Sequence, residues 1–143
     1  MKILVINSGS STIKYRLFDL EADVMLASGM VEKIGETQSR LIYTAAGATT
    51  IERSEPVADH HAGMGLIVEF LTSDEYGAIR DRSDIDAIGH RVVHGGEEFH
   101  EPVEIDEGVI SAILDNIHLA PLHNPANLDG IETAMNYFPG VRQ

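Results

Sequence analysis

The stretch ILVINSGSSTIKYRLFDL, residues 3–20, decides the fold because it predicts two strands joined by a tight polar turn. Its first four residues are all apolar, which is typical of a strand buried on both faces. The segment NSGSS that follows consists of turn-forming residues. Beyond it the pattern alternates, so that Ile13, Tyr15 and Leu17 share one face of a second strand.

Further strands and helices follow along the chain. We expect strands at 24–31 and 87–93, and a hairpin formed by 41–45 and 49–53. Apolar residues at helical spacing predict helices at 63–71, 109–117 and 128–138. Asp106 is the expected N-cap of the second helix, and Asn124-Pro125 the expected N-cap and first residue of the third. This order favours an α/β or α+β domain whose sheet starts antiparallel or mixed.

Composition limits the possible functions. The 143 residues suggest one domain, and 10 basic against 23 acidic residues give a net charge of −13. Such an acidic chain repels nucleic acid and anionic membranes. The absence of cysteine excludes a disulfide scaffold, a thiolate zinc site and a cysteine nucleophile. Since no signal peptide or membrane span is recognised, we expect a soluble cytoplasmic protein.

The first candidate site is the turn NSGSSTIK, residues 7–14. Small residues after a buried strand allow backbone N–H groups to point at an anion. The hydroxyls of Ser10 and Thr12 add donors, and Lys14 adds a positive charge. The stretch matches neither of the common glycine-rich phosphate motifs. A polar hairpin turn without a ligand explains it equally well.

The second candidate is HRVVHGG, residues 90–96, at the end of a predicted buried strand. Ligands bind at such strand ends in open α/β sheets, and the Arg91 guanidinium suits a carboxylate or a phosphate. The alternative is an ion pair between Arg91 and one of the many acidic side chains. A zinc site at His90 and His94 is disfavoured because the stretch contains no third ligand.

The third candidate is APLHNP, residues 120–125, in which two prolines hold His123 on a rigid loop. An imidazole in that position can contact phosphate, although an exposed loop histidine is the simpler interpretation. Four further histidines lie on polar stretches and are assigned no role: His60, His61, His100 and His118.

Together the three stretches resemble the acetate kinase family, in the order and spacing of that family's N-terminal portion. The resemblance extends from Ile3 to Val141. It implies a superfamily that also contains sugar kinases, chaperone ATPases and actin. The implied fold is α/β, with a mixed sheet that opens in three antiparallel strands, as the ribonuclease-H-like half of an actin-like two-domain kinase. Residues 1–143 would be an incomplete N-terminal domain, without the C-terminal nucleotide-binding domain.

The resemblance also implies the chemistry, which is reversible phosphoryl transfer from ATP to acetate, giving acetyl phosphate and ADP. It assigns catalysis to Arg91 and His123, and acetate binding to Arg91, Val93 and Leu122. It assigns the phosphate or nucleotide side to four residues: Asn7, Ser10, Thr12 and Lys14. Mg²⁺ is expected with the ATP, with Asn7 near its water shell. The catalytic aspartate, a second arginine, a magnesium-binding glutamate and the adenine pocket would lie downstream.

Further expectations concern the assembly and the alternatives. A homodimer is implied for the full-length enzyme, and these 143 residues alone are expected to be inactive. A propionate or butyrate kinase is the alternative enzyme. A truncated, non-catalytic anion-binding module is the alternative from another class. A chaperone-like or actin-like ATPase would have no reason to carry APLHNP.

Overall fold

The computed structural model describes residues 1–93, 95–97 and 99–143. Its strands are β1 (Lys2–Ser8), β2 (Ile13–Asp19), β3 (Val24–Glu32), β4 (Ser39–Ala45), β5 (Ile51–Glu55) and β6 (Ala87–His90). Its α-helices are α1 (His60–Leu71), α2 (Glu107–Asp115) and α3 (Asn124–Tyr137), with 3₁₀ turns η1 (Arg82–Asp84) and η2 (Ile117–Leu119). Each strand and helix expected from the sequence is present.

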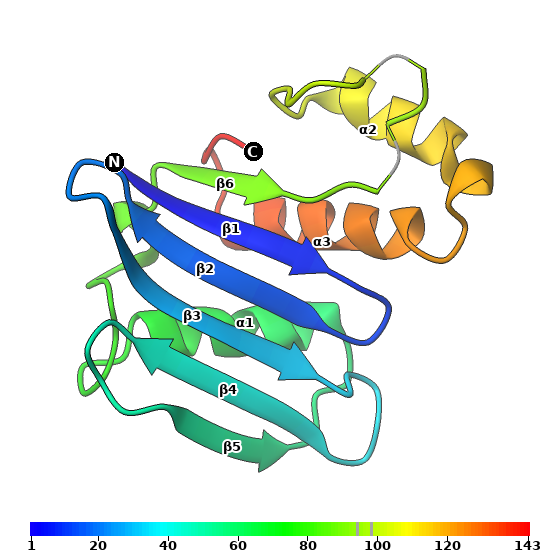
Figure 1. Ribbon diagram of the computed structural model, residues 1–143. Helices are drawn as coiled ribbons and strands as arrows, with labels where there is room; N and C mark the ends of the chain where they lie inside the picture. Colours follow the sequence, from blue (N-terminus) through cyan, green and yellow to red (C-terminus); the bar gives the residue numbers. More distant parts are fainter. Residues whose placement is uncertain (94, 98) are drawn as a thin grey trace.

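The strands of the described part of the chain form one six-stranded sheet in the order β5-β4-β3-β2-β1-β6. Strands β1 to β5 pair antiparallel with their sequence neighbours, whereas β6 pairs parallel with β1. Figure 1 shows β1 and β6 side by side with their arrowheads pointing in the same direction. The expected mixed α/β sheet with an antiparallel opening is therefore confirmed.

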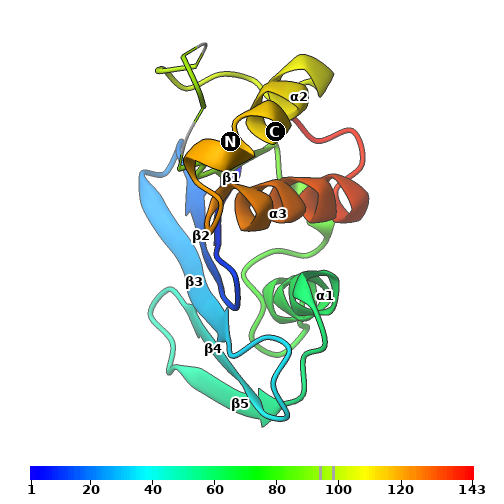
Figure 2. The ribbon, with the colours of Figure 1, turned by 90° about the vertical axis from the view of Figure 1, so that its right-hand side faces the viewer.

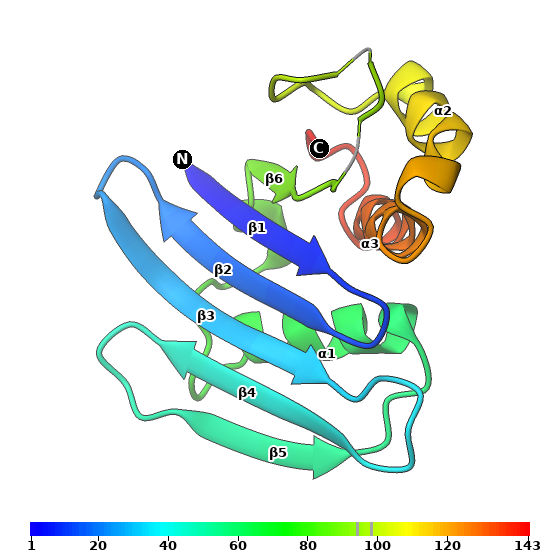
Figure 3. The ribbon, with the colours of Figure 1, turned by 45° about the vertical axis from the view of Figure 1, so that its right-hand side comes forward.

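Helices α1 and α3 cover one face of this sheet (Figures 2 and 3). The alternation in β2 explains this, because Ile13, Tyr15 and Leu17 are buried while Lys14 and Arg16 are exposed. Helix α2 packs on α3, and the two helices share a small apolar cluster of their own. No described helix combines the length and the apolar character that crossing a membrane requires.

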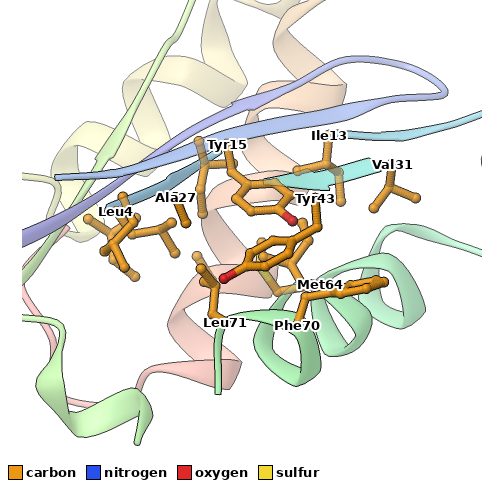
Figure 4. Close-up of a cluster of buried hydrophobic side chains, with 14 of the residues drawn as sticks. Leu4, Ile13, Tyr15, Ala27, Val31, Tyr43, Met64, Phe70 and Leu71 are labelled. Carbon is orange, nitrogen blue, oxygen red and sulfur yellow. The ribbon is translucent and has the colours of Figure 1, made fainter. Parts of the chain in front are cut away.

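The main core lies between the sheet and the two helices (Figure 4). The ring of Tyr43 from β4 stacks on Phe70 from α1, with centroids 5.4 Å apart and an interplanar angle of 19°. The Tyr43 hydroxyl donates to the carbonyl oxygen of Tyr76 at 3.1 Å, so the buried ring leaves its polar end satisfied. Helix α1 is thereby packed against β4, the strand next to the edge strand β5.

Side-chain caps set the starts of two helices. Asp59 accepts the N–H of Ala62 at 2.8 Å at the start of α1. Asp106 accepts the N–H of Val109 at 2.9 Å, as expected for the N-cap of α2.

The start of α3 differs from expectation by one residue. His123, not Asn124, occupies the N-cap position, and it makes no side-chain cap hydrogen bond. The reason is the preceding turn, in which Asn124 donates its N–H to Ala120 at 2.9 Å and so enters the helical pattern early. Asn124 is then a buried residue of the first turn.

The strand predicted at 87–93 is shorter than expected and ends at His90. Beyond it the Val93 N–H donates to the side-chain oxygen of Asn127 at 3.0 Å instead of to a neighbouring strand. The chain leaves the sheet here because the Val93 N–H bonds to α3. This contact joins residues far apart in the sequence, so a local sequence pattern does not predict it.

Gly29 of β3 provides a test of this packing. A Cβ at this position would overlap the hydroxyl of Tyr15 and the carbonyl oxygen of Ile42. We expect Gly29→Ala to lower the free energy of unfolding by about 3 kcal/mol through overpacking. Gly89→Ala is the matched control, because its Cβ would meet only Val5 Cγ2 at 3.9 Å. Urea denaturation of both variants gives the answer, and equal midpoints would contradict the packing described.

Candidate functional site

Strands β1 and β6 lie side by side (Figure 1), and Arg91 directly follows the last residue of β6, an edge strand of the sheet. Ile6 is in register with His90 in the parallel pair, and the Arg91 N–H continues the ladder to the Ile6 carbonyl oxygen at 3.2 Å. Arg91 is exposed. Within the described residues it forms no ion pair, so the alternative in which an acidic side chain neutralises it is not supported.

The turn between β1 and β2 presents unused donors. The Gly9 N–H donates to the Thr12 carbonyl oxygen at 2.8 Å and closes the turn. In the described part of the chain, the backbone N–H groups of Ser10, Ser11 and Thr12 have no acceptor. Three such groups in one short turn suit an anion. The stretch is thus a hairpin turn, in agreement with the simpler interpretation. Among the described residues, three of its backbone N–H groups have no hydrogen-bond acceptor.

Asn7 and Lys14 stand opposite each other in the β1–β2 register, so they are cross-strand neighbours at the base of this turn. Asn7 is half-buried and Lys14 is exposed. Ser10 is exposed and Thr12 half-buried within the turn itself. The four residues expected on the phosphate side are therefore together.

His60, at the start of α1, contacts the same turn although its sequence context predicts no role. Its Nε2 lies 2.6 Å from the Gly9 carbonyl oxygen, and since a carbonyl only accepts, Nε2 carries the hydrogen. Its Nδ1 is 3.6 Å from a carboxylate oxygen of Asp129 on α3. The Gly9 carbonyl is thus occupied by His60 and not by the Thr12 N–H across the turn. No feature of the sequence distinguishes His60 from His61.

The third stretch forms a turn that leads into α3. The His123 N–H donates to the Ala120 carbonyl oxygen at 3.1 Å, which fixes His123 as an exposed residue at the start of the helix. Val93 and Leu122, the two apolar residues expected to contact acetate, are 44% and 78% exposed. Both side chains are exposed, and neither lines the cavity that contains Arg91.

Asn127 of α3 connects the three stretches. Its Nδ2 donates to the Ser8 carbonyl oxygen at 2.8 Å, and its Oδ1 accepts the Val93 N–H at 3.0 Å. Its backbone N–H donates to His123 at 2.9 Å. The sequence analysis missed this residue. Its position one helical turn after His123 is the only local signal, and that spacing is common.

A cavity of about 700 Å³ opens beside β6 and includes Arg91 in its lining. Residues 99–105 and the apolar side of α2 form the opposite wall. His90 also lines it, with Nε2 2.8 Å from Oε1 of Gln143. Burial lowers the pKa of His90 more than this hydrogen bond raises it, so the ring is neutral near neutral pH.

The described residues contain no cluster of three metal-ligating side chains. His94, half of the disfavoured zinc pair, lies outside those residues. The turn from Asn7 to Lys14 offers amide and hydroxyl oxygens and no carboxylate. This donor set fits a Mg²⁺ ion that keeps its water shell and is held mainly by phosphates.

Comparisons with known proteins agree with this geometry. The model of the "Acetokinase family" matches residues 2–143. The acetate kinase of Maridesulfovibrio salexigens is 52% identical over the whole chain, and that of Thermotoga maritima is 50% identical over 99% of it. The chain spans about a third of these relatives, 36% and 35% of their lengths.

Solved structures give the same result. The crystal structure of Porphyromonas gingivalis acetate kinase superposes with a TM-score of 0.94 at 42% identity, covering 99% of this chain and 36% of that one. The structure of a propionate kinase from Francisella tularensis gives a TM-score of 0.88 at 32% identity, covering 99% and 35%.

The half-buried His90 gives a test of the site's electrostatics. Because folding lowers its pKa, the unfolded chain binds the proton first as pH falls, and stability is lost below about pH 6.5. When the pH falls from about 7.5 to about 5, the free energy of unfolding decreases. We expect this decrease to be smaller in His90→Gln than in the unsubstituted chain. His118→Gln, at an exposed position, is the control. Urea midpoints at both pH values measure the effect, and an unchanged loss in His90→Gln contradicts it.

Proposed function

Because the chain belongs to the acetokinase family, we propose that it supplies the acetate-binding and phosphate-binding part of an acetate kinase. The reaction is the reversible transfer of a phosphoryl group from ATP to acetate, giving acetyl phosphate and ADP. The observation that carries the proposal is an exposed Arg91 without an ion-pair partner among the described residues, next to a turn with vacant N–H donors. In a chain of net charge −13, such a concentration of donors suits an anionic substrate.

The chemistry requires little proton transfer. A carboxylic acid with a pKa of about 4–5 is already ionised at neutral pH, so the nucleophile needs no general base. The difficulty is the electrostatic repulsion between the acetate anion and the negatively charged phosphate groups of ATP. Catalysis therefore rests on positioning and on neutralising the charge of the transition state.

Charge and position assign the roles. Arg91 holds the acetate carboxylate or the transferring phosphoryl group through its planar donors. His123 hydrogen-bonds the phosphoryl oxygens as their charge redistributes. The support for both roles is that the two side chains are exposed and that Arg91 has no ion-pair partner among the described residues.

Val93 and Leu122 provide the apolar floor for the acetate methyl group. Their exposure supports this role, because an exposed Leu122 is available for contact with a substrate or with another part of the protein. An apolar pocket discriminates by about 1–3 kcal/mol per methylene, so propionate is a slower substrate. The likeness to a propionate kinase makes preference for propionate the second candidate function.

The phosphate side is formed by Asn7, Ser10, Thr12 and Lys14. Vacant N–H groups in this turn bind phosphate oxygens, and Lys14 adds a charge beside them. When bound with ATP, Mg²⁺ neutralises phosphate charge, and Asn7 contacts its water shell. The remaining length of the curated relatives supplies the nucleotide site and the homodimer contacts in this proposal, and the whole protein is cytoplasmic.

The 143 residues by themselves provide one test of the proposed function. We expect no formation of acetyl phosphate from acetate, ATP and magnesium, because the chain covers only about a third of its relatives. Trapping acyl phosphate with hydroxylamine measures this, with an intact relative as the positive control. Protein-dependent turnover that disappears in Arg91→Ala would show that these residues carry a working site.

Another test uses a chimera in which residues 1–143 replace the aligned part of the Maridesulfovibrio salexigens enzyme. We expect Arg91→Ala to lower kcat/KM by about 100-fold or more, because a donor to developing charge is lost. Lys14→Ala is expected to lose about tenfold or less, because the turn's backbone donors remain. Steady-state kinetics with acetate distinguish the two, and equal losses contradict the role of Arg91. A substrate series decides between acetate and propionate.

A further inference from the structure

The buried side chain of Asn127 is a hydrogen-bonded link between two stretches, at Ser8 and at Val93, that are distant from each other in the sequence. Only 5% of the residue is exposed. Its amide donates to Ser8 at the end of β1 and accepts from Val93 after β6, while its backbone N–H donates to His123. Its side chain thus contacts the backbone of Ser8, next to the phosphate turn, and of Val93, in the proposed acetate floor. Its backbone N–H contacts His123, the proposed phosphoryl ligand.

The side-chain amide of an asparagine matches both backbone groups at this position. The Ser8 carbonyl needs a donor and the Val93 N–H needs an acceptor, and a side-chain amide offers both from one planar group. An aspartate keeps an acceptor for Val93 and sets a carboxylate against the Ser8 carbonyl oxygen. An alanine leaves both backbone groups without their partner.

The surrounding packing allows no adjustment of the helix. Gly130, one turn further along α3, lies so close to β1 that a Cβ there would be 2.5 Å from Ser8 Cβ. The Ser8 hydroxyl is buried in this contact and has no hydrogen-bond partner among the described residues. Because α3 rests directly on the end of β1, the fold sets the reach of Asn127 to Ser8 and to the segment after β6.

We propose that Asn127 is a positioning residue for the phosphoryl transfer, an inference that rests on the proposed function. By holding the Val93 N–H, it sets the place of the apolar acetate floor relative to the phosphate turn. Asn127 itself contacts no substrate. Its loss therefore weakens acetate binding and alignment, while binding of MgATP is expected to change little.

The first test measures the link in the 143-residue chain by amide hydrogen exchange. In Asn127→Ala we expect the protection of the Val93 N–H to fall at least about tenfold, while that of Tyr15 in β2 stays unchanged. Asn136→Ala is the matched control, the same substitution at an exposed position of the same helix. An equal fall at Val93 and Tyr15, or no fall at Val93, overturns the proposal.

The second test measures function in the chimera. We expect Asn127→Ala to raise the acetate KM at least about tenfold and to leave the MgATP KM within about twofold, with Asn136→Ala unchanged in both. Asn127→Asp, which retains the acceptor for Val93, is expected to show a smaller rise. Partial unfolding lowers only the apparent kcat, so a fall in kcat alone, or any other pattern of the two KM values, overturns the proposal.

The two tests separate two kinds of failure. If the unsubstituted chimera has no activity with acetate while the relative is active, the proposed function is wrong. The exchange result then still decides whether Asn127 holds Val93. If the chimera is active and both KM values are unaffected by Asn127→Ala, the proposed function stands and the role of Asn127 is wrong.

Discussion

The close approach of α3 to the end of β1 is the contact on which the candidate site depends. It exists because residue 130 is glycine, and a Cβ there would overlap Ser8. With the helix backbone so near, one short side chain, Asn127, reaches the strand end and the segment after β6 together. A helix a few ångströms further out would need a longer and more flexible side chain, and the three stretches would lose their fixed relation.

Recognition of an anion by so acidic a chain follows from where its donors are placed. Repulsion from distant surface charges is screened by salt over about 8–10 Å, whereas donors within hydrogen-bond reach act at full strength. The turn after β1 contributes backbone N–H groups, which remain whatever the side chains are. The Gly9 carbonyl oxygen in the same turn accepts from His60 and, among the described residues, from none of these N–H groups. The scaffold thus provides the donors, and Arg91 adds the charge.

The elements of the fold were predictable because their signals are local. The alternation in β2 and the Asp106 cap depend on neighbours a few residues away, and both are confirmed. The end of β6 and the first residue of α3 were wrong because contacts made elsewhere decide them, Val93 with Asn127 and Asn124 with Ala120. The motif residues were found from their chemistry and their family resemblance. His60 and Asn127 were missed because each acts through a backbone group of a distant segment, for which the sequence carries no pattern.

The hydrogen bond between Asn127 and Ser8 joins residues 119 positions apart, which has a consequence for biosynthesis. The meander of β1 to β5 has mostly short-range partners and can form early, while the Ser8 carbonyl oxygen still lacks its hydrogen bond from α3. At about 5–20 residues per second, the ribosome needs on the order of ten seconds more before α3 is complete. During that interval the nascent chain exposes the sheet face on which α3 will lie, a surface suited to chaperone binding. Because these contacts are far apart in the sequence, the alignment of Val93 with the turn is the last part of the site that the emerging polypeptide completes.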